Sequence, residues 1–385
     1  MPIVTLPFDT NDRYHRQMLL PDIGDAGQAR LSSSHVFVAG CGALGCAIID
    51  ALARAGVGTL TIIDRDLVEL TNLQRQALFV EADVEDALPK AEAARRRIAA
   101  INRAVTVHAH VDDLHADNAR RYTSDADVLV DGLDNFETRY LLNDLAVRRG
   151  VPYVYGGAVG TVGTALTILP HPEHRADGAS PRRIEWTADQ ATPCLRCIFP
   201  EAPPPGSTPT CDTAGVLGPV VTTIAAHQAV ETIKLLVGAI DAVDRSLLSV
   251  DVWANESRRF DVHRARSAQE PSDCPCCGRG DFAFMEGDAT GRASVLCGRD
   301  AVQITPPPRG PARGGDIDLA AMAARLEPHG VFIANAFLLR GVFERETTPA
   351  GEPIELTLFP NGRAIVKGIA EADAARALYA RYVGT

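Results

Sequence analysis

Apolar runs alternate with segments of helical periodicity over the first 150 residues of the chain. The predicted strands span 35–40, 59–64, 105–111 and 127–134, and the predicted helices span 43–56, 89–102 and 136–150. Strands separated by helices of this length are typical of βαβ units, which build a parallel sheet. The pattern therefore predicts an α/β fold.

The pattern changes after residue 150. Further strands are predicted at 152–157, 164–170, 246–254 and 257–263. The stretch 171–215 is rich in Pro, Gly, Thr and charged residues, and a loop of this length is typically functional or disordered. A long, mostly apolar helix is predicted at 216–238. Its few polar side chains indicate burial, and a second subunit is one surface that would bury it.

The last ~95 residues predict a separate small α+β unit, within the usual size range of a domain. Its predicted elements are a strand at 294–304, a helix at 316–326, strands around 330–343, 354–359 and 363–368, and a helix at 370–382. The segment Pro360–Gly362 between two of these strands is a hairpin signal. The predicted division of the chain is an N-terminal helical segment (1–34), a main domain (35–265), a cysteine-containing segment (266–290) and the small unit (291–385).

Charge and cysteine content argue against several classes of protein. Lys and Arg number 38 and Asp and Glu number 49, and the net charge of −11 disfavours general nucleic-acid binding. No apolar run approaches the ~20 residues of a membrane span. The start of the chain lacks the pattern of a secretory signal. Nine cysteines are too sparse for a disulfide scaffold, so we expect a cytoplasmic protein.

A glycine-rich turn follows the first predicted strand. Gly40, Gly42 and Gly45 form a GxGxxG pattern that opens the next helix, and Asp64 ends the second strand 19 residues later. Glycines in this pattern let a phosphate approach the helix N-terminus, and an acid at that distance binds a ribose hydroxyl. This context predicts nucleotide binding. It leaves the nucleotide open, and an NAD-dependent oxidoreductase remains an alternative.

Polar and cationic residues beyond the glycine turn favour attack on a triphosphate over hydride transfer. Asn72 and Arg75 lie in the segment Thr71–Gln76, and Lys90 lies at the start of the following helix. Hydride transfer needs no Arg and Lys directed at phosphates. Attack on a triphosphate does, because negative charge spreads over the transferred and leaving groups. The alternative is a solvated charged loop and a lysine on a helix surface.

Asp131 and Asp134 lie near the end of the strand predicted at 127–134. Ligands of open α/β sheets bind at this edge, and a carboxylate there can hold Mg²⁺, which bridges phosphates. The alternative role is to cap the next helix, and Asp134 with Asn135 could serve both purposes.

Two Cys-x-x-Cys pairs predict a metal site. Cys194 with Cys197 and Cys274 with Cys277 are separated by 76 residues. Four thiolates suit tetrahedral zinc and leave no open position, so we expect structural zinc, with redox pairs as the alternative. Cys276 lies inside the second pair and is an alternative ligand.

Cys211 is a candidate nucleophile in the irregular loop. A thiol there would react once deprotonated, and the dipole of the helix beginning near 216 would favour the thiolate. A passive cysteine is the alternative. Cys41 and Cys46 lie in the glycine turn and the next helix, where we expect them to pack.

Taken together, these motifs resemble the ThiF/MoeB/HesA family, bacterial relatives of ubiquitin-activating enzymes. The resemblance covers about residues 13–280. The matching segments are RYHRQ (13–17), GCGALGC (40–46), TIIDRDLVELTNLQRQ (61–76), PKAEAA (89–94), GLDNFETRYLLND (132–144), PCLRC (193–197), TCDTAGVLGPV (210–220), QAVETIKLLVG (228–238) and CPCCG (274–278). It implies a Rossmann-like adenylation domain with a mostly parallel sheet continued by antiparallel strands and a zinc knuckle.

The resemblance also implies an activity and a site. Members use ATP to adenylylate the C-terminal Gly-Gly carboxylate of a ubiquitin-like sulfur carrier protein, and pyrophosphate leaves. The implied nucleotide-binding residues are Gly40, Gly42, Gly45, Asp64, Asn72, Arg75 and Lys90. Asp134 resembles an aspartate linked to Mg²⁺. The family also places zinc on Cys194, Cys197, Cys274 and Cys277.

Partners follow from the same resemblance. Arg16 resembles an arginine supplied to the ATP of a neighbouring subunit, which implies a homodimer. Cys211 resembles a loop cysteine that takes part in sulfur transfer in thiazole-type members, with a cysteine desulfurase or another sulfur donor as partner. The thiamine, molybdopterin, cysteine and thiolated-tRNA pathways all stay open. A non-catalytic scaffold for nucleotide or a ubiquitin-like partner is a further alternative.

The C-terminal unit departs from the simple family pattern. It is too short for the rhodanese domain that some relatives carry, and Cys297 lies inside a predicted strand. We therefore expect a small α+β module that docks the carrier or another partner, without a persulfide on Cys297.

Overall fold

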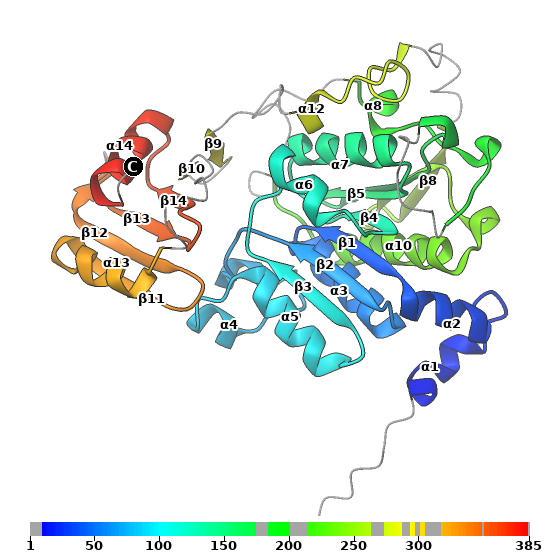
Figure 1. The fold of residues 1–385 in the computed structure, drawn as a ribbon, viewed down its shortest axis with the longest axis horizontal. Helices are drawn as coiled ribbons and strands as arrows, with labels where there is room; N and C mark the ends of the chain where they lie inside the picture. The colour runs from blue at the N-terminus through cyan, green and yellow to red at the C-terminus, as the bar shows by residue number, and fades with distance from the viewer. Residues whose placement is uncertain are drawn as a thin grey trace, which may run out of the picture. The chain divides into compact units, whose positions relative to one another are not determined.

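The structure is a computed structural model that describes residues 10–174, 184–200, 214–262, 273–286, 293–296, 301–304, 317–348 and 350–383. The chain divides into two compact units. One comprises Met1–Pro203 with Pro209–Ala289, and the other comprises Pro204–Thr208 with Thr290–Thr385. Each unit has its own sheet (Figure 1).

An eight-stranded sheet forms the centre of the first unit. Its order is β3-β2-β1-β4-β5-β6-β7-β8. The strands are β1 (His35–Ala39), β2 (Thr59–Ile63), β3 (Thr106–His110), β4 (Val128–Asp131), β5 (Tyr153–Val159), β6 (Val162–Ile168), β7 (Leu247–Asp251) and β8 (Glu256–Phe260). Strands β1 to β5 pair in parallel, and β6, β7 and β8 extend the sheet in antiparallel fashion. The predicted α/β fold is therefore confirmed.

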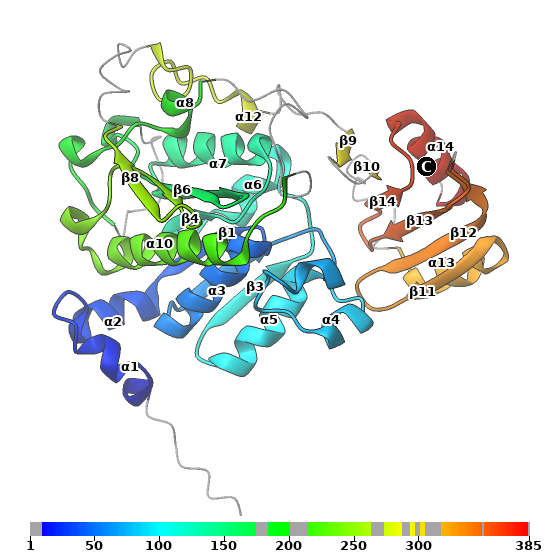
Figure 2. The ribbon, with the colours of Figure 1, turned by 180° about the vertical axis from the view of Figure 1, so that it is seen from behind.

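Helices cover both faces of this sheet (Figures 1 and 2). One face carries α3 (Ala43–Ala55), α5 (Lys90–Ile101) and α10 (Gly218–Val237), and the other carries α6 (Ala116–Tyr122) and α7 (Phe136–Arg149). Helix α10 is long and apolar enough to cross a membrane, but most of that stretch is buried in the unit. It packs on α3, β5 and β6, so its apolar side chains form part of the core, as its composition predicted.

Two N-terminal helices, α1 (Thr10–Met18) and α2 (Gly24–Ser33), precede β1. Tyr14 on α1 is 7% exposed, and its hydroxyl accepts a hydrogen bond from Asn102 Nδ2 at 2.7 Å. The ring of Tyr14 occupies space that a Cβ at Gly56 would fill, since that atom would lie 2.5 Å from the ring. These contacts fix α1 beside the C-terminal ends of α3 and α5.

The sequence pattern missed several short helices of the first unit. Besides α6, they are α4 (Glu81–Glu85), α8 (Leu195–Ile198) and α12 (Ala283–Glu286). Helix α6 is polar and seven residues long, so it shows no apolar period. It begins where the Asn118 side chain accepts a hydrogen bond from the His115 amide at 2.9 Å.

The second unit has a six-stranded sheet in the order β11-β12-β13-β14-β10-β9. Its elements are β9 (Ala293–Leu296), β10 (Ala301–Ile304), α13 (Leu319–Leu326), β11 (Gly330–Ala334), β12 (Leu339–Thr347), β13 (Pro353–Leu358), β14 (Ala364–Lys367) and α14 (Ala372–Tyr382). Both helices share one core with the sheet. The α+β architecture agrees with the prediction, and the hairpin at Pro360–Gly362 closes β13 onto β14.

Two predicted strands of this unit are each a pair of antiparallel strands. The run 294–304 comprises β9 and β10, and the run 330–343 comprises β11 and the start of β12. In the second case Asn335 makes the turn, because its side-chain oxygen accepts hydrogen bonds from the amides of Phe337 and Leu338. Side chains of Asn stabilise such turns locally.

Candidate functional site

The glycine turn lies between β1 and α3, at the carboxyl edge of the parallel strands. Gly40 has a φ of +88°, and a Cβ on Gly45 would lie 2.0 Å from the Gly40 carbonyl oxygen. A side chain at either position would therefore distort the turn. Gly42 is the N-cap of α3 and makes no side-chain cap. No side chain thus caps the first amides of α3, and a helix N-terminus of this kind can bind a phosphate.

Asp64 follows β2 and holds the glycine turn in place. Its Oδ2 accepts a hydrogen bond from the Cys41 amide at 2.7 Å, and its Oδ1 accepts one from the Asp66 amide at 2.7 Å. Burial raises the pKa of Asp64, against the opposing charge of Lys90. Carboxylate oxygens have further lone pairs, so a ribose hydroxyl can still bind here.

Lys90 begins α5 and lies next to the same turn. It is 5% exposed, so the alternative of a solvated surface lysine is wrong. Its Nζ lies 2.9 Å from Asp66 Oδ2. Burial disfavours its charge, but the carboxylates of Asp66 and Asp64 outweigh burial and raise the pKa of Lys90. The ammonium is therefore charged at neutral pH and held at the edge of the site.

Asn72 and Arg75 make local contacts. Asn72 is 1% exposed and its Oδ1 accepts a hydrogen bond from the Glu69 amide at 3.1 Å. Arg75 donates to the Thr71 carbonyl at 2.9 Å and lines a shallow hollow of about 680 Å³ beside the first turn of α10. The side chains of Asn72 and Arg75 therefore bond within their own loop, whereas Lys90 pairs with Asp66.

The two aspartates after β4 have different environments. Asp131 is fully buried and accepts hydrogen bonds from Arg139 Nε at 3.1 Å, the Tyr153 hydroxyl at 2.7 Å and the Leu133 amide at 2.8 Å. Arg139 also donates to the carbonyls of Leu133 and Gly156. Asp131 is therefore a structural residue, and the idea that it offers a carboxylate to a metal is wrong.

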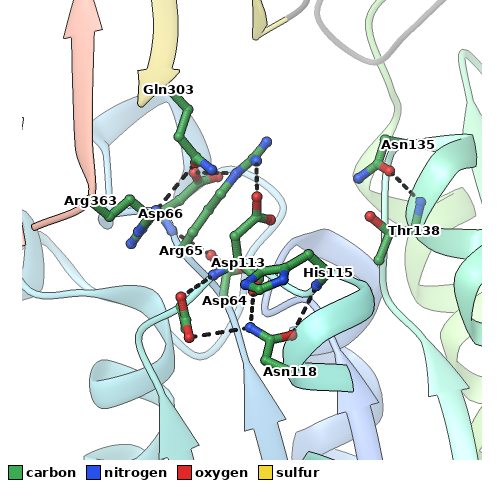
Figure 3. Close-up of polar contacts among 11 residues, drawn as sticks. Asp64, Arg65, Asp66, Asp113, His115, Asn118, Asn135, Thr138, Gln303 and Arg363 are labelled. Atoms are coloured by element: carbon green, nitrogen blue, oxygen red, sulfur yellow. Dashed lines mark hydrogen bonds and ion pairs between the residues drawn. The ribbon is translucent and has the colours of Figure 1, made fainter. Parts of the chain in front are cut away.

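Asp134 is exposed at the same edge. Its negative charge contributes to the raised pKa values of Lys90, Arg65 and Arg139. The cap of α7 is Asn135, whose Oδ1 accepts a hydrogen bond from the Thr138 amide at 2.9 Å (Figure 3). The side chain of Asp134 is thus not needed to cap the helix.

Arg65 is a residue at this edge that sequence reasoning missed. It lies between Asp64 and Asp66 and donates from Nη1 to Asp113 Oδ2 at 3.1 Å (Figure 3). Burial lowers the pKa of Arg65, but Asp113 and neighbouring carboxylates outweigh burial and raise it. A cation directly after the acid that ends a strand was the available signal.

Arg16 lies far along the unit from these residues. It is exposed on α1, which is anchored at the C-terminal end of α5, where Arg13 donates to the Ile101 carbonyl at 3.0 Å. The glycine turn lies at the other end of α3, a helix of 13 residues and about 20 Å. The structure therefore does not bring Arg16 to the glycine turn of its own chain.

The four cysteines of the two Cys-x-x-Cys pairs converge. The Sγ atoms of Cys194, Cys197, Cys274 and Cys277 all lie within 4.8 Å of one another. Individual Sγ–Sγ distances are 3.8 Å for Cys194–Cys197, 3.7 Å for Cys194–Cys274 and 3.3 Å for Cys197–Cys277. Tetrahedral zinc with bonds of about 2.3 Å holds its sulfurs about 3.8 Å apart, so the donor set fits zinc.

Cys276 lies outside this group of four. Its Sγ accepts a hydrogen bond from Asn143 Nδ2 at 3.3 Å, while Asn143 Oδ1 accepts one from the Leu195 amide at 2.8 Å. Asn143, which sequence reasoning also missed, therefore links the two cysteine segments from α7. Cys211 and Cys297 lie outside the described residues.

Comparison with protein families matches residues 14–276 to the ThiF family. The chain belongs to the ThiF family. The match contains the glycine turn, Asp64, Lys90, Asp134 and three of the four cysteines of the cluster, so the resemblance read from the motifs is confirmed. The small second unit lies beyond the matched residues.

Curated relatives match two thirds or more of the chain. The sulfur carrier protein ThiS adenylyltransferase of Bacillus subtilis is 38% identical over 97% of this chain and 99% of the relative. The SAMP-activating enzyme E1 of Haloferax volcanii is 39% identical over 74% of this chain and 95% of the relative. The sulfur carrier protein adenylyltransferase of Thermus thermophilus is 38% identical over 69% of this chain and 90% of the relative.

Solved structures share the fold at lower identity. E. coli MccB, solved with ATP, superposes with a TM-score of 0.55 at 22% identity and covers 70% of this chain and 75% of MccB. PaaA superposes with a TM-score of 0.51 at 22% identity. At this identity the likeness supports the ThiF-type fold and nothing finer.

Proposed function

We propose that this chain uses ATP to adenylylate the C-terminal Gly-Gly carboxylate of a ubiquitin-like sulfur carrier protein. The carboxylate attacks the α-phosphate, the bond to pyrophosphate breaks, and an acyl-adenylate forms. The observation that carries the proposal is the relative from Bacillus subtilis, since the two chains match over nearly their full lengths. The oxidoreductase and scaffold alternatives gain no support from the named relatives.

The arrangement at the carboxyl edge supports the same chemistry. The start of α3 has no side-chain cap, Asp64 bonds the glycine turn at the Cys41 amide, and charged Lys90 lies beside Asp66. Fixed cations favour a transition state in which negative charge spreads over the phosphates. We assign nucleotide binding to Gly40, Gly42, Gly45, Asp64, Asn72, Arg75 and Lys90.

Mg²⁺ is the cation we expect with ATP, and Asp134 is the residue that would hold it. An exposed carboxylate that no helix cap occupies, beside the cations of the site, suits an ion that takes oxygen ligands and bridges phosphates. Bound there, Mg²⁺ would neutralise charge on the leaving pyrophosphate. The chain's own residues orient the nucleotide around it.

Zinc is the metal we propose for the cysteine cluster, in a structural role. Four sulfur donors at suitable separations leave no position open for a substrate. The cluster would join the segment that precedes Cys211 to the segment that precedes the second unit. A role for Cys211 in sulfur transfer, a desulfurase as sulfur donor and a cytoplasmic location remain parts of the proposal, as do the domain boundaries predicted above.

A homodimer would place Arg16 at the ATP of the neighbouring subunit. The distance between Arg16 and the glycine turn of its own chain supports an action in trans. Mixing Arg16→Ala with Asp134→Asn tests this, because a heterodimer then contains one intact site. We expect about a quarter of the wild-type sites to be restored at random pairing. Lack of restoration would refute the action in trans.

ATP–pyrophosphate exchange tests the proposed activity. The purified chain is assayed with a panel of Gly-Gly-ended carriers, with and without Mg²⁺, and we expect carrier-dependent and Mg²⁺-dependent exchange. Asp134→Asn should lose it, whereas Asp25→Asn, an exposed aspartate on α2, should not. The carrier that supports exchange identifies the pathway. ATP binding without exchange for any carrier would contradict the proposal.

A further inference from the structure

We propose that Arg65 binds the base of the nucleotide. The inference rests on the proposed function, because it assigns a role within the same ATP site. It starts from the turn that carries Arg65. Asp64 is bonded to the Cys41 amide on one side, and Asp66 is bonded to Lys90 on the other. The backbone that bears Arg65 is therefore fixed at both ends.

The sheet order indicates which part of a nucleotide lies near Arg65. The strands run β3-β2-β1-β4, with the glycine turn after β1 and Asp64 after β2. A nucleotide with its phosphates on the glycine turn and its ribose on Asp64 extends toward β3. Arg65 reaches in that direction and bonds Asp113 in the loop after β3 (Figure 3). The guanidinium thus lies on the side of the base.

The loop that holds the guanidinium is itself fixed. Asn118, which is 6% exposed, donates from Nδ2 to the Asp113 carbonyl at 2.7 Å and accepts from the His115 amide at 2.9 Å. Asp113 therefore holds Arg65 from a rigid support. The Arg65 side chain keeps a quarter of its surface exposed. A preformed, partly exposed guanidinium loses little freedom when a ligand binds it.

The shape of the guanidinium suits a base as its ligand. Asp113 holds it at 3.1 Å on the side of β3, away from the glycine turn. A planar guanidinium stacks on aromatic faces. Arg65 therefore suits the face of a purine ring.

Calorimetric binding measurements separate the two halves of ATP. AMP, adenosine and tripolyphosphate are titrated into the wild-type chain, Arg65→Ala and the control Arg54→Ala. Arg54 is matched in type and pairs with Asp50 on the surface of α3. We expect Arg65→Ala to bind AMP and adenosine about 5- to 30-fold more weakly and tripolyphosphate unchanged. GTP binding should weaken by a similar factor, because a guanidinium stacks on either purine.

Two further variants keep the test decisive. Arg65→Lys retains charge but not the plane, so we expect it to resemble Arg65→Ala. Asp113→Asn leaves Arg65 in place but loosens its anchor, so AMP should bind more weakly by a smaller factor. Equal weakening of tripolyphosphate and AMP would overturn the assignment to the base, and unchanged AMP binding would overturn any contact with the nucleotide.

The measurement needs no carrier, which separates this proposal from the proposed function. Suppose that Arg65→Ala binds AMP more weakly but tripolyphosphate as before, and that the wild type shows no pyrophosphate exchange. This result would support the role of Arg65 in nucleotide binding and refute the proposed adenylylation. Exchange in the wild type with unchanged binding in Arg65→Ala would do the reverse. A wild-type chain that binds neither ATP nor AMP would overturn both.

Discussion

Replacing Asp131 by alanine should destabilise the fold, which would distinguish this buried aspartate from its exposed neighbour Asp134. The carboxylate accepts hydrogen bonds from Arg139, Tyr153 and the Leu133 amide, all in the interior. Loss of one partner of a buried ion pair costs about 3–5 kcal/mol. Arg139 keeps the carbonyls of Leu133 and Gly156, which places the expected loss near the lower end. The Tyr153 hydroxyl also loses its acceptor, at about 1 kcal/mol.

The expected sum is about 4 kcal/mol of unfolding free energy, or roughly 10 °C in Tm for a unit of this size. Thermal denaturation followed by circular dichroism measures it. Tyr153→Phe alone should cost about 1.5 kcal/mol. In the Asp131→Ala background the same change should cost almost nothing, because the hydroxyl then has no carboxylate to bind. Equal costs in both backgrounds would refute the network.

The contrast with Asp134 completes the test. Asp134→Asn should leave the free energy of unfolding within about 0.5 kcal/mol of the wild type, since the side chain is exposed. It should still lower pyrophosphate exchange by at least about 100-fold. A large fall in Tm for Asp134→Asn would show that the two residues share one structural role.

Three further outcomes follow from the structure. Gly45→Ala should destabilise the chain and abolish ATP binding, because the added Cβ would lie 2.0 Å from the backbone. Gly42→Ala should fold, because its Cβ would lie 3.6 Å from the backbone. Calorimetry of both variants measures the difference. Cys194→Ser should lower bound zinc from about one equivalent to near zero, as measured by atomic emission. Burial lowers the pKa of His35 from 6.5, against the opposing charges of Asp127 and Asp125. The neutral imidazole therefore contributes its full stability above pH 6.5, and this stability is lost as the pH falls and the ring is protonated. His35→Gln should therefore make Tm less dependent on pH, and an unchanged slope between about pH 7.5 and about pH 5.5 would contradict this assignment.

Local patterns predicted much of the first unit. Apolar runs and helical periods located β1 to β8 and the long helices. Burial explains the apolar pattern of core strands such as β1, β2 and β4, but not that of β8, whose residues are all exposed. Short polar helices such as α6 left no such period. The strand predicted at 294–304 is two antiparallel strands, and the Gly298-Arg299-Asp300 sequence between them was the turn signal that the prediction passed over.

The residues of the candidate site also fall into those that the sequence predicted and those that only the tertiary structure distinguished. By itself the sequence determined the family and the group of four cysteines, and it predicted the glycine turn, Asp64 and Lys90 as site residues, because such functions need particular residue types at fixed spacing. Only the tertiary structure decided between residues of equal type. It buried Asp131 and exposed Asp134, excluded Cys276 from the group of four, and joined Arg65 to Asp113 across two loops. Those distinctions arise from packing between segments distant in the chain, which no local pattern records.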